Sequence, residues 1–321
     1  MGIYRKIYKK NGLSISLDIN QTDREGQSLR KLIIEARVNE YMMREQGNPH
    51  VPYSPDEIAR DAVACRDAGA SILHFYARKP DGSPEHAIEA YAETVGLIRQ
   101  RSDILVHPTL GYVTLDQPAE QRLDHILDMA RDEEQAPHFA PMDMGSVNVD
   151  RYNAQARRFE TTDLIYKNST QTLSYFARHI RAAGLKPYLV YWNIGFTRYA
   201  QAFLDMGLLD EPAFLCFCLT DNTFLGGHPG TLKGLQAHLD FLPADRQVEW
   251  TVVNFGGNLF SLAGAIIAQG GHISIGLGDY AYPELGQPTN AQIIARIAEM
   301  ARELGREIAT PQETRAILGM H

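Results

Sequence analysis

The chain has 321 residues, of which 44% are hydrophobic and 22% charged, and a formal net charge of −8. This size and composition are typical of one large soluble α/β domain. The acidic balance, without a basic stripe, argues against nucleic acid or a membrane as partner. Neither a signal peptide nor an apolar run of membrane-spanning length is present, and the three cysteines make no disulfide framework. We therefore expect a cytoplasmic protein.

Two segments are predicted, an N-terminal arm over residues 1–30 and one domain over residues 31–321. The arm is polar and irregular after Leu17, and we expect an arm or hairpin laid over the domain and used in oligomer contacts. From Lys31 the sequence KLIIEARVN alternates as a buried strand does. If its polar face points into a barrel, Glu35 and Arg37 must pair with each other or with further polar groups. We favour a structural role for this pair.

The second predicted strand lies within Gly69–Gly82, GASILHFYARKPDG. Its back is wholly apolar, whereas its other face carries His74 and Tyr76, followed in step by Arg78. Polar side chains at the carboxyl end of a buried strand are where α/β proteins keep their sites. The alternative is that His74 is an ordinary core histidine.

The rest of the chain alternates between predicted helices and strands. Capping boxes at Ser54, Thr289 and Thr310 each predict the start of a helix. Further helices are expected at His86–Arg101, Gln121–Asp132, Ser169–Ala183, Phe196–Met206, Leu232–Leu242 and Leu259–Gln269. Further strands are expected at Ile104–Thr109, Phe139–Met142, Lys186–Trp192, Ala213–Leu219, Glu249–Val253 and His272–Leu277.

Eight strands alternating with helices predict a (β/α)8 TIM barrel. The alternative is a doubly wound sheet, but no G-x-G-x-x-G follows the first strand, so its dinucleotide-binding version is unsupported.

A barrel brings all its strand ends to one rim, so polar residues distant in sequence can meet there. The candidates are Asn39, Glu40, His74, Tyr76, Arg78, His107, Thr109, Asp143, Asn148, Trp192, Asn193, Asp221, Asn222, Asn254, Ser274 and Asp279. Amides, carboxylates and two histidines suit a small substrate with carbonyl or carboxylate groups. Each asparagine or aspartate alone is also typical of a turn or a helix cap.

From about Lys31 onward the chain resembles the β-keto acid cleavage enzyme family. The matching stretches are HVPYSPDEIARDA, AGASILHFYARKPDGSP, IRQRSDILVHPTLG, the glycines Gly270 and Gly271 before His272, and the strand end GLGDY. The resemblance implies a TIM barrel, a homodimer or homotetramer, and transfer of a two-carbon unit from a β-keto acid to acetyl-CoA. The products are then acetoacetate and a new CoA thioester.

The family's zinc is held by an H-x-H pair on strand two and a glutamate after strand eight. An aspartate beside that glutamate is the base, and an arginine earlier in strand eight assists. The first histidine, the base and a small hydroxyl residue near the substrate correspond to His74, Asp279 and Thr109. The second histidine, the ligand glutamate and the arginine are replaced by Tyr76, Gly278 and Ser274.

One imidazole without a carboxylate cannot hold zinc tightly. One alternative is a displaced site for zinc or another divalent metal. It would be built from His74, His107 and a rim carboxylate such as Glu40 or Asp143. The other is a metal-free site in which Tyr76 donates a hydrogen bond to a substrate carbonyl.

We therefore predict a β-keto acid cleavage enzyme with acetyl-CoA as co-substrate. The expected catalytic residues are Asp279, Tyr76 and Thr109, and the expected substrate-binding residues are Asn39, Glu40, Arg78, Asn254 and Ser274. Two alternatives stay open. One is a metal-independent enzyme of another reaction with Asp279 or His74 as base, and the other is a barrel that binds a ligand without catalysis.

Overall fold

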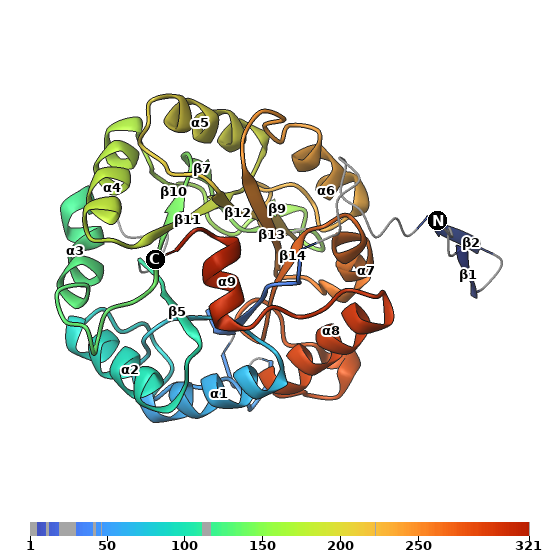
Figure 1. Ribbon diagram of the computed structural model, residues 1–321, viewed down its shortest axis with the longest axis horizontal. Helices are drawn as coiled ribbons and strands as arrows, with labels where there is room; N and C mark the ends of the chain where they lie inside the picture. Colours follow the sequence, from blue (N-terminus) through green and yellow to red (C-terminus); the bar gives the residue numbers. More distant parts are fainter. Residues whose placement is uncertain are drawn as a thin grey trace.

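The centre of the molecule is an eight-stranded parallel sheet enclosed by a ring of helices (Figure 1). The computed structural model describes residues 5–10, 13–18, 30–40, 43–45, 47–110, 117–221 and 223–320. The strands of the sheet are β3 (Ile34–Asn39), β4 (Ile72–Phe75), β5 (Leu105–Pro108), β6 (Phe139–Asp143), β11 (Lys186–Tyr191), β12 (Ala213–Thr220), β13 (Val248–Phe255) and β14 (His272–Ile275).

The sheet curls into a barrel. Its hydrogen-bonded order is β5-β4-β3-β14-β13-β12-β11-β6. The seam between β5 and β6 is bridged by the His138 amide, which donates to the Val106 carbonyl oxygen at 2.9 Å. All eight strands lie where the alternation predicts them, and the predicted TIM barrel is confirmed.

The helices also lie where they are predicted, with ends that differ by a few residues. They are α1 (Pro55–Ala68), α2 (Ile88–Arg101), α3 (Ala119–Met129), α4 (Thr170–Ala182), α5 (Ile194–Asp205), α6 (Leu232–Leu239), α7 (Phe260–Ala268), α8 (Asn290–Glu303) and α9 (Pro311–Ile317). The capping boxes at Ser54, Thr289 and Thr310 all form. Helix α9 lies across the amino-terminal end of the barrel (Figure 1), where Thr314 donates to the Ser71 hydroxyl at 2.8 Å.

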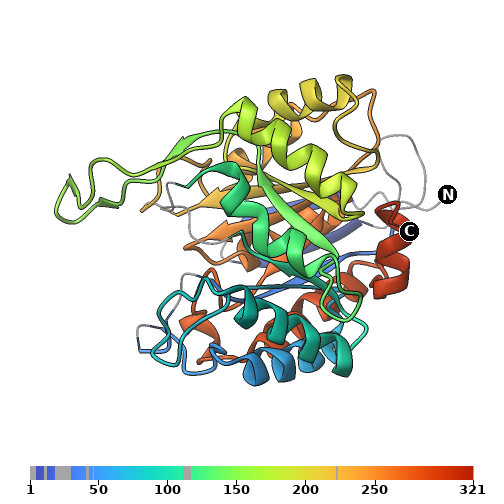
Figure 2. The ribbon, with the colours of Figure 1, turned by 90° about the vertical axis from the view of Figure 1, so that its left-hand side faces the viewer.

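Two segments stand outside the regular βα repeat. At the N-terminus, β1 (Arg5–Lys10) and β2 (Leu13–Asp18) pair as an antiparallel hairpin. The boundary at residue 30 and the use of the arm in oligomer contacts stay predictions. Between β6 and α4 the chain makes a long excursion that projects beyond the carboxyl ends of the strands (Figure 2). It contains β7 (Val147–Asn148), β8 (Tyr152–Asn153), β9 (Arg158–Phe159) and β10 (Ile165–Tyr166). A short 3-10 helix, Pro283–Leu285, follows β14.

Strand register determines which polar side chains meet inside the barrel. Arg37 pairs in register with His74, and His74 with His107, so three neighbouring strands bring these residues to one level. Glu35 is in register with Ser274, one level nearer the amino-terminal end. The polar side chains of β3 therefore occupy two successive levels of the interior. Within the described part of the chain, no helix has both the length and the apolar character needed to cross a bilayer.

Candidate functional site

A cavity of about 400 Å³ opens at the carboxyl ends of the strands, the end at which TIM barrels keep their sites. Most of its wall is apolar, with contributions from Val190, Val253 and Phe255. Its polar lining residues include Arg37, Glu40, His74, Tyr76, His107 and Thr109, and also Asp143, Arg151 and Tyr166. The structure thus brings His74, Tyr76, His107, Thr109 and Glu40 together, as expected for strand-end residues.

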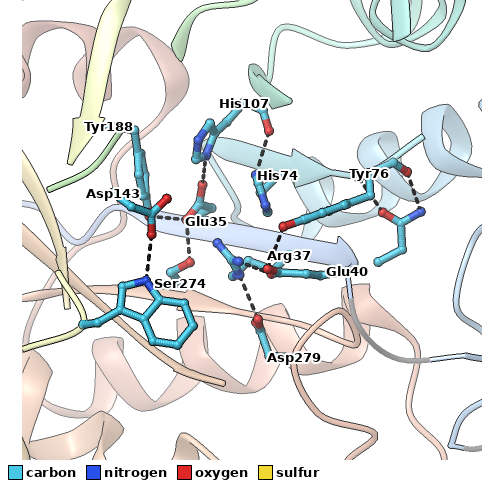
Figure 3. Close-up of polar contacts among 12 residues, drawn as sticks. Glu35, Arg37, Glu40, His74, Tyr76, His107, Asp143, Tyr188, Ser274 and Asp279 are labelled. Carbon is cyan, nitrogen blue, oxygen red and sulfur yellow. Dashed lines mark hydrogen bonds and ion pairs between the residues drawn. The ribbon is translucent and has the colours of Figure 1, made fainter. Parts of the chain in front are cut away.

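Arg37 is the centre of the group that we call the upper layer, which comprises Arg37, Glu40, His74, Tyr76 and Asp279 (Figure 3). Its Nε donates to Asp279 Oδ1 at 3.0 Å and its Nη2 is ion-paired with the Glu40 carboxylate. The Tyr76 hydroxyl donates to the other Glu40 oxygen at 2.8 Å. The Nη1 of Arg37 makes no hydrogen bond within the part of the chain that the structure describes, although Arg37 lines the cavity.

Burial controls the protonation of this layer. It raises the pKa of Asp279 well above the usual value; Arg37 opposes the shift and the Glu40 charge adds to it. Burial likewise raises the pKa of Tyr76 far above 10, which keeps the phenol neutral. A neutral phenol is a hydrogen-bond donor and a poor metal ligand.

His74 presents an acceptor to the cavity. Its Nδ1 lies 2.8 Å from the His107 carbonyl oxygen, which can only accept, so the proton is on Nδ1 and Nε2 carries the lone pair. Burial lowers the pKa of His74 well below 6.5, and the charge of Arg37 lowers it further. The imidazole is therefore neutral at physiological pH.

A second polar group, the lower layer, surrounds Glu35 and comprises Glu35, His107, Tyr188 and Ser274. Glu35 and Ser274 lie one level below the upper layer, and His107, at the level of His74, bonds Glu35 from there. The Glu35 carboxylate accepts from His107 Nδ1 at 2.7 Å, from the Tyr188 hydroxyl at 2.5 Å and from the Ser274 hydroxyl. Glu35 and Ser274 are fully buried. Donors around Glu35, the first of them His107, hold its pKa below the usual value although burial opposes this.

The zinc implied by the resemblance fits poorly at the expected position. Tyr76 is neutral and already donates to Glu40. A Cβ added at Gly278 would lie 2.9 Å from the Glu40 amide nitrogen and 3.1 Å from the Arg37 carbonyl oxygen. A glutamate there would therefore collide with the backbone at the end of β3. At the family's position the chain offers one imidazole and no carboxylate.

The displaced metal site requires a correction. Ligand atoms of Glu35, His74 and His107 all lie within 4.8 Å of one another. The carboxylate beside the two histidines is thus Glu35, whereas Glu40 or Asp143 was expected. Three donors already occupy the Glu35 oxygens, and Glu35 does not line the cavity. These hydrogen bonds explain the cluster without a cation, and a metal bound there would cost the donors their acceptor.

Asp143 instead belongs to the cavity wall. It accepts from Trp192 Nε1 at 2.7 Å and from the Tyr166 hydroxyl at 2.9 Å. Burial raises its pKa. Its two oxygens are thereby held by the residue that follows β11 and by Tyr166 of the excursion, which orients this part of the wall.

Several predicted substrate-binding residues lie behind the cavity wall. The Asn39 amide donates to the carbonyl oxygens of Pro52 and Tyr76 and accepts from the Tyr76 amide at 2.9 Å, so it ties the end of β3 to β4. Arg78 donates to the carbonyl oxygens of Gly82 and Glu40 and holds the loop after β4. Both are buried, and neither lines the cavity. Their geometry is that of loop anchors.

Of the other predicted residues, some line the cavity and some are buried behind its wall. Thr109 lines the cavity, Ser274 belongs to the lower layer, and Asp279 is buried behind Arg37. Asn254 is buried away from the cavity wall, and a Cβ at Gly230 or Gly257 would lie 2.5 Å from its side chain. Asn222 lies outside the described residues.

Sequence reasoning missed the role of Arg37. The alternation predicts that Glu35 and Arg37 pair with each other or with further polar groups, and the second case holds: Glu35 bonds within the lower layer and Arg37 bonds the carboxylates above. The signal was present, since period-2 alternation places both on the interior face and Arg37 nearer the carboxyl end. Tyr166 was also missed, and its short strand in the excursion has no periodic pattern that would reveal it.

Comparison with known proteins gives consistent results. The sequence profile described as "beta-keto acid cleavage enzyme" matches residues 31–320. A 3-keto-5-aminohexanoate cleavage enzyme of Fusobacterium nucleatum is 30% identical over 295 residues, 91% of this chain and 99% of that protein. A 3-dehydrocarnitine:acetyl-CoA trimethylamine transferase of Rhizobium meliloti is 26% identical and covers 83% of this chain and 89% of that protein.

Among solved structures, ObcA in complex with oxaloacetate superposes with a TM-score of 0.64 at 15% identity. The match covers 85% of this chain and 68% of that one, so this chain spans about two thirds of the length of ObcA. At this identity the likeness supports the fold, a TIM barrel, and carries no information on the reaction.

Proposed function

Since this chain belongs to the β-keto acid cleavage enzyme family, matched over residues 31–320, we propose that it transfers the two-carbon unit of a β-keto acid to acetyl-CoA. The bond between C2 and C3 of the keto acid breaks, and C2 joins the acetyl carbonyl carbon to give acetoacetate. The released acyl group forms a thioester with the CoA thiolate freed from acetyl-CoA, and this new acyl-CoA leaves. The names of the relatives support this reaction, since one is a 3-keto-5-aminohexanoate cleavage enzyme and another acts with acetyl-CoA.

The single feature of the site that supports the reaction best is Arg37, a buried cation at the base of a largely apolar cavity, flanked by Glu40 and Asp279. Removal of the C2 proton leaves an enolate, whose negative charge is stabilised by fixed donors in a site of low dielectric constant. The proton passes to the carboxylate pair through Glu40, the member of the pair that lines the cavity. Its raised pKa makes the Asp279 carboxylate a stronger base than an ordinary aspartate.

Tyr76 and Thr109 complete the proposed machinery. Both line the cavity, and the neutral Tyr76 hydroxyl is a donor that can turn from Glu40 to a substrate carbonyl oxygen. His74 Nε2, a lone-pair acceptor, faces the same space and can receive a hydrogen bond from the substrate or from a water. We leave zinc out of the proposal because the residues at the family's position do not fit it.

We further propose a cytoplasmic homodimer or homotetramer. Phe159 and Ile165 of the excursion are each 50% exposed, and burial of such side chains would stabilise an interface. All three cysteines are free and buried, which suits a reducing compartment. Light scattering of the purified chain measures the assembly, and a monomer at micromolar concentration would contradict it.

The test is a search for acetoacetate and a new acyl-CoA by mass spectrometry. The purified protein is incubated with acetyl-CoA and a panel of β-keto acids that differ in side-chain size and charge. We expect turnover of at least one of them, and a loss of about 100-fold or more in Asp279→Asn. A folded wild-type protein that produces no acyl-CoA from any member of the panel would favour one of the two alternatives, another reaction or a non-catalytic barrel.

A further inference from the structure

The cationic centre of this site differs from the one that the resemblance implies. Tyr76 and Gly278 remove two of the three expected zinc ligands, while Arg37 stands in register with His74 on the neighbouring strand. We propose that the Arg37 guanidinium takes the place of the family's metal ion: it binds the carboxylate of the β-keto acid and stabilises the enolate formed beside it. This inference rests on the function proposed above and adds that the reaction proceeds without a divalent cation.

The hydrogen bonding of Arg37 leaves one nitrogen for a ligand. Asp279 takes Nε and Glu40 takes Nη2, so the guanidinium plane is fixed from two sides. Nη1 makes no hydrogen bond to any described residue, and the side chain lines the cavity. A carboxylate oxygen or an enolate oxygen in the cavity would meet a donor that is already oriented, and little ordering is needed on binding.

The charge of Arg37 is permanent and largely shielded from water. Arg37 is 8% exposed, and guanidinium stays protonated throughout the physiological range. Attraction to an anion is stronger in this low-dielectric site than at the surface. A single charge is weaker than that of a dication, but the guanidinium adds directional hydrogen bonds that match the planar carboxylate.

The same features oppose a metal at this place. A divalent cation beside His74 would lie next to the guanidinium, and like charges repel strongly in a buried site. Gly278 leaves no room for the missing glutamate, because its Cβ would contact the backbone of Glu40 at 2.9 Å. The Tyr76 phenol is held by Glu40, which is itself paired with Arg37. The residues that replace the zinc ligands, Tyr76 and Gly278, are therefore both compatible with an arginine at this place and unfavourable for a metal ion.

The decisive experiment compares wild type, Arg37→Lys and Arg37→Ala after treatment with a strong chelator. Arg66→Lys is the matched control, since Arg66 pairs with Asp103 on the outside of the barrel. We expect full activity in chelated wild type and in Arg66→Lys. We expect a loss of about 100-fold in kcat/KM for Arg37→Lys, because lysine keeps the charge but loses the fork of donors.

Arg37→Ala should lose more activity, and millimolar guanidinium chloride should restore part of it by filling the space left by the side chain. A melting temperature for each variant shows whether it folds. If Arg37→Ala does not fold, the lysine variant and the chelated wild type still decide the question. Loss of wild-type activity on chelation, with recovery on adding zinc, would overturn the role of Arg37 while leaving the proposed reaction intact.

Absence of turnover in untreated wild type would instead contradict the proposed reaction. In that case calorimetry with acetoacetate as the probe tests Arg37 separately. Binding to the chelated wild type that weakens about 10-fold or more in Arg37→Lys would support the anion site. Equal binding by the two proteins, or no binding by either, would overturn it.

Discussion

Both polar layers inside the barrel contain a glutamate, a histidine and a tyrosine, but only the upper layer contains an arginine. In the lower layer, three donors converge on the two oxygens of Glu35, which does not line the cavity. His107 of this layer does line the cavity, and its Nε2 has no hydrogen-bond partner among the described residues. In the upper layer, Arg37 Nη1 has no partner among the described residues, and His74 Nε2 faces open space. The carboxylate of the lower layer is fully paired within the protein, while the guanidinium of the upper layer keeps an oriented donor for a ligand.

Because of this difference, we expect the lower layer to contribute mainly to stability and the upper layer mainly to function. A buried polar network whose members satisfy one another holds strands together. A network that holds an oriented donor without an acceptor can bind an anionic substrate, whose oxygen then accepts the hydrogen bond. Variants of the lower layer should therefore change folding, and variants of the upper layer should change turnover.

Glu35→Leu should show the largest effect, a loss of about 3–5 kcal/mol in the free energy of unfolding. The substitution removes the acceptor of His107, Tyr188 and Ser274 at once. Urea denaturation measures it. Glu35→Gln is the matched control and should lose less, because its amide oxygen still accepts and His107 can move its proton to Nε2. A loss below about 1 kcal/mol in the leucine variant would contradict a stabilising lower layer.

Tyr76→Phe tests the upper layer and should lower kcat/KM by about 10- to 100-fold with little change in the melting temperature. The lost hydroxyl is the donor that now bonds Glu40. Tyr191→Phe is the control, since the buried Tyr191 hydroxyl has no hydrogen-bond partner among the described residues. A Tyr76→Phe variant with a lower melting temperature but normal kcat/KM would contradict the assignment of the upper layer to function.

His238→Phe extends the comparison to a buried polar group without partners. His238 stacks on Phe217 with ring centroids 4.6 Å apart, and neither of its ring nitrogens has a hydrogen-bond partner within the described residues. A phenyl ring keeps the stacking and removes two unsatisfied groups, so the free energy of unfolding should rise by about 1–2 kcal/mol. A drop in stability would show that the imidazole is satisfied in solution.

His138, at the seam between β5 and β6, should make stability depend on pH. Burial, with the charges of Arg315 and Arg99, lowers its pKa to about 3, and its Nδ1 accepts from the Val106 amide at 2.8 Å. The unfolded chain binds a proton below about pH 6.5 and the folded chain does not, so stability falls as pH falls.

Between pH 6.5 and pH 5.5, His138 should lower the free energy of unfolding by about 1 kcal/mol. Urea denaturation of wild type and His138→Gln at the two pH values measures the difference, since the glutamine oxygen keeps the hydrogen bond from Val106 without titrating. Equal pH dependence of the two proteins would contradict it.

The sequence predicts the barrel well because its elements depend on local patterns. Alternation along β3 and β4 and the capping boxes of α1, α8 and α9 act over a few residues, and each produces the expected element. Alternation also indicates that Glu35, Arg37, His74 and Tyr76 share the interior.

The partners of these residues across the barrel were not predictable, because they depend on strand stagger and on side-chain reach. Glu35 was expected to pair with Arg37 or with further polar groups, and its partner Tyr188 of β11 lies 153 residues away in the chain. Asn39 and Arg78 have the composition of a binding rim but use their hydrogen bonds to hold loops. Composition at a strand end therefore indicates the neighbourhood of a site, and the contacts decide which residues a ligand can reach.

The most direct test of Arg37 as the anion site is a crystal structure of the chelated protein with acetoacetate bound. We predict that a carboxylate oxygen of acetoacetate lies within about 3 Å of Arg37 Nη1, with the ligand methyl group toward the apolar wall. A ligand bound away from Arg37, or a metal ion about 2.0–2.1 Å from His74 Nε2 in the untreated protein, would contradict it.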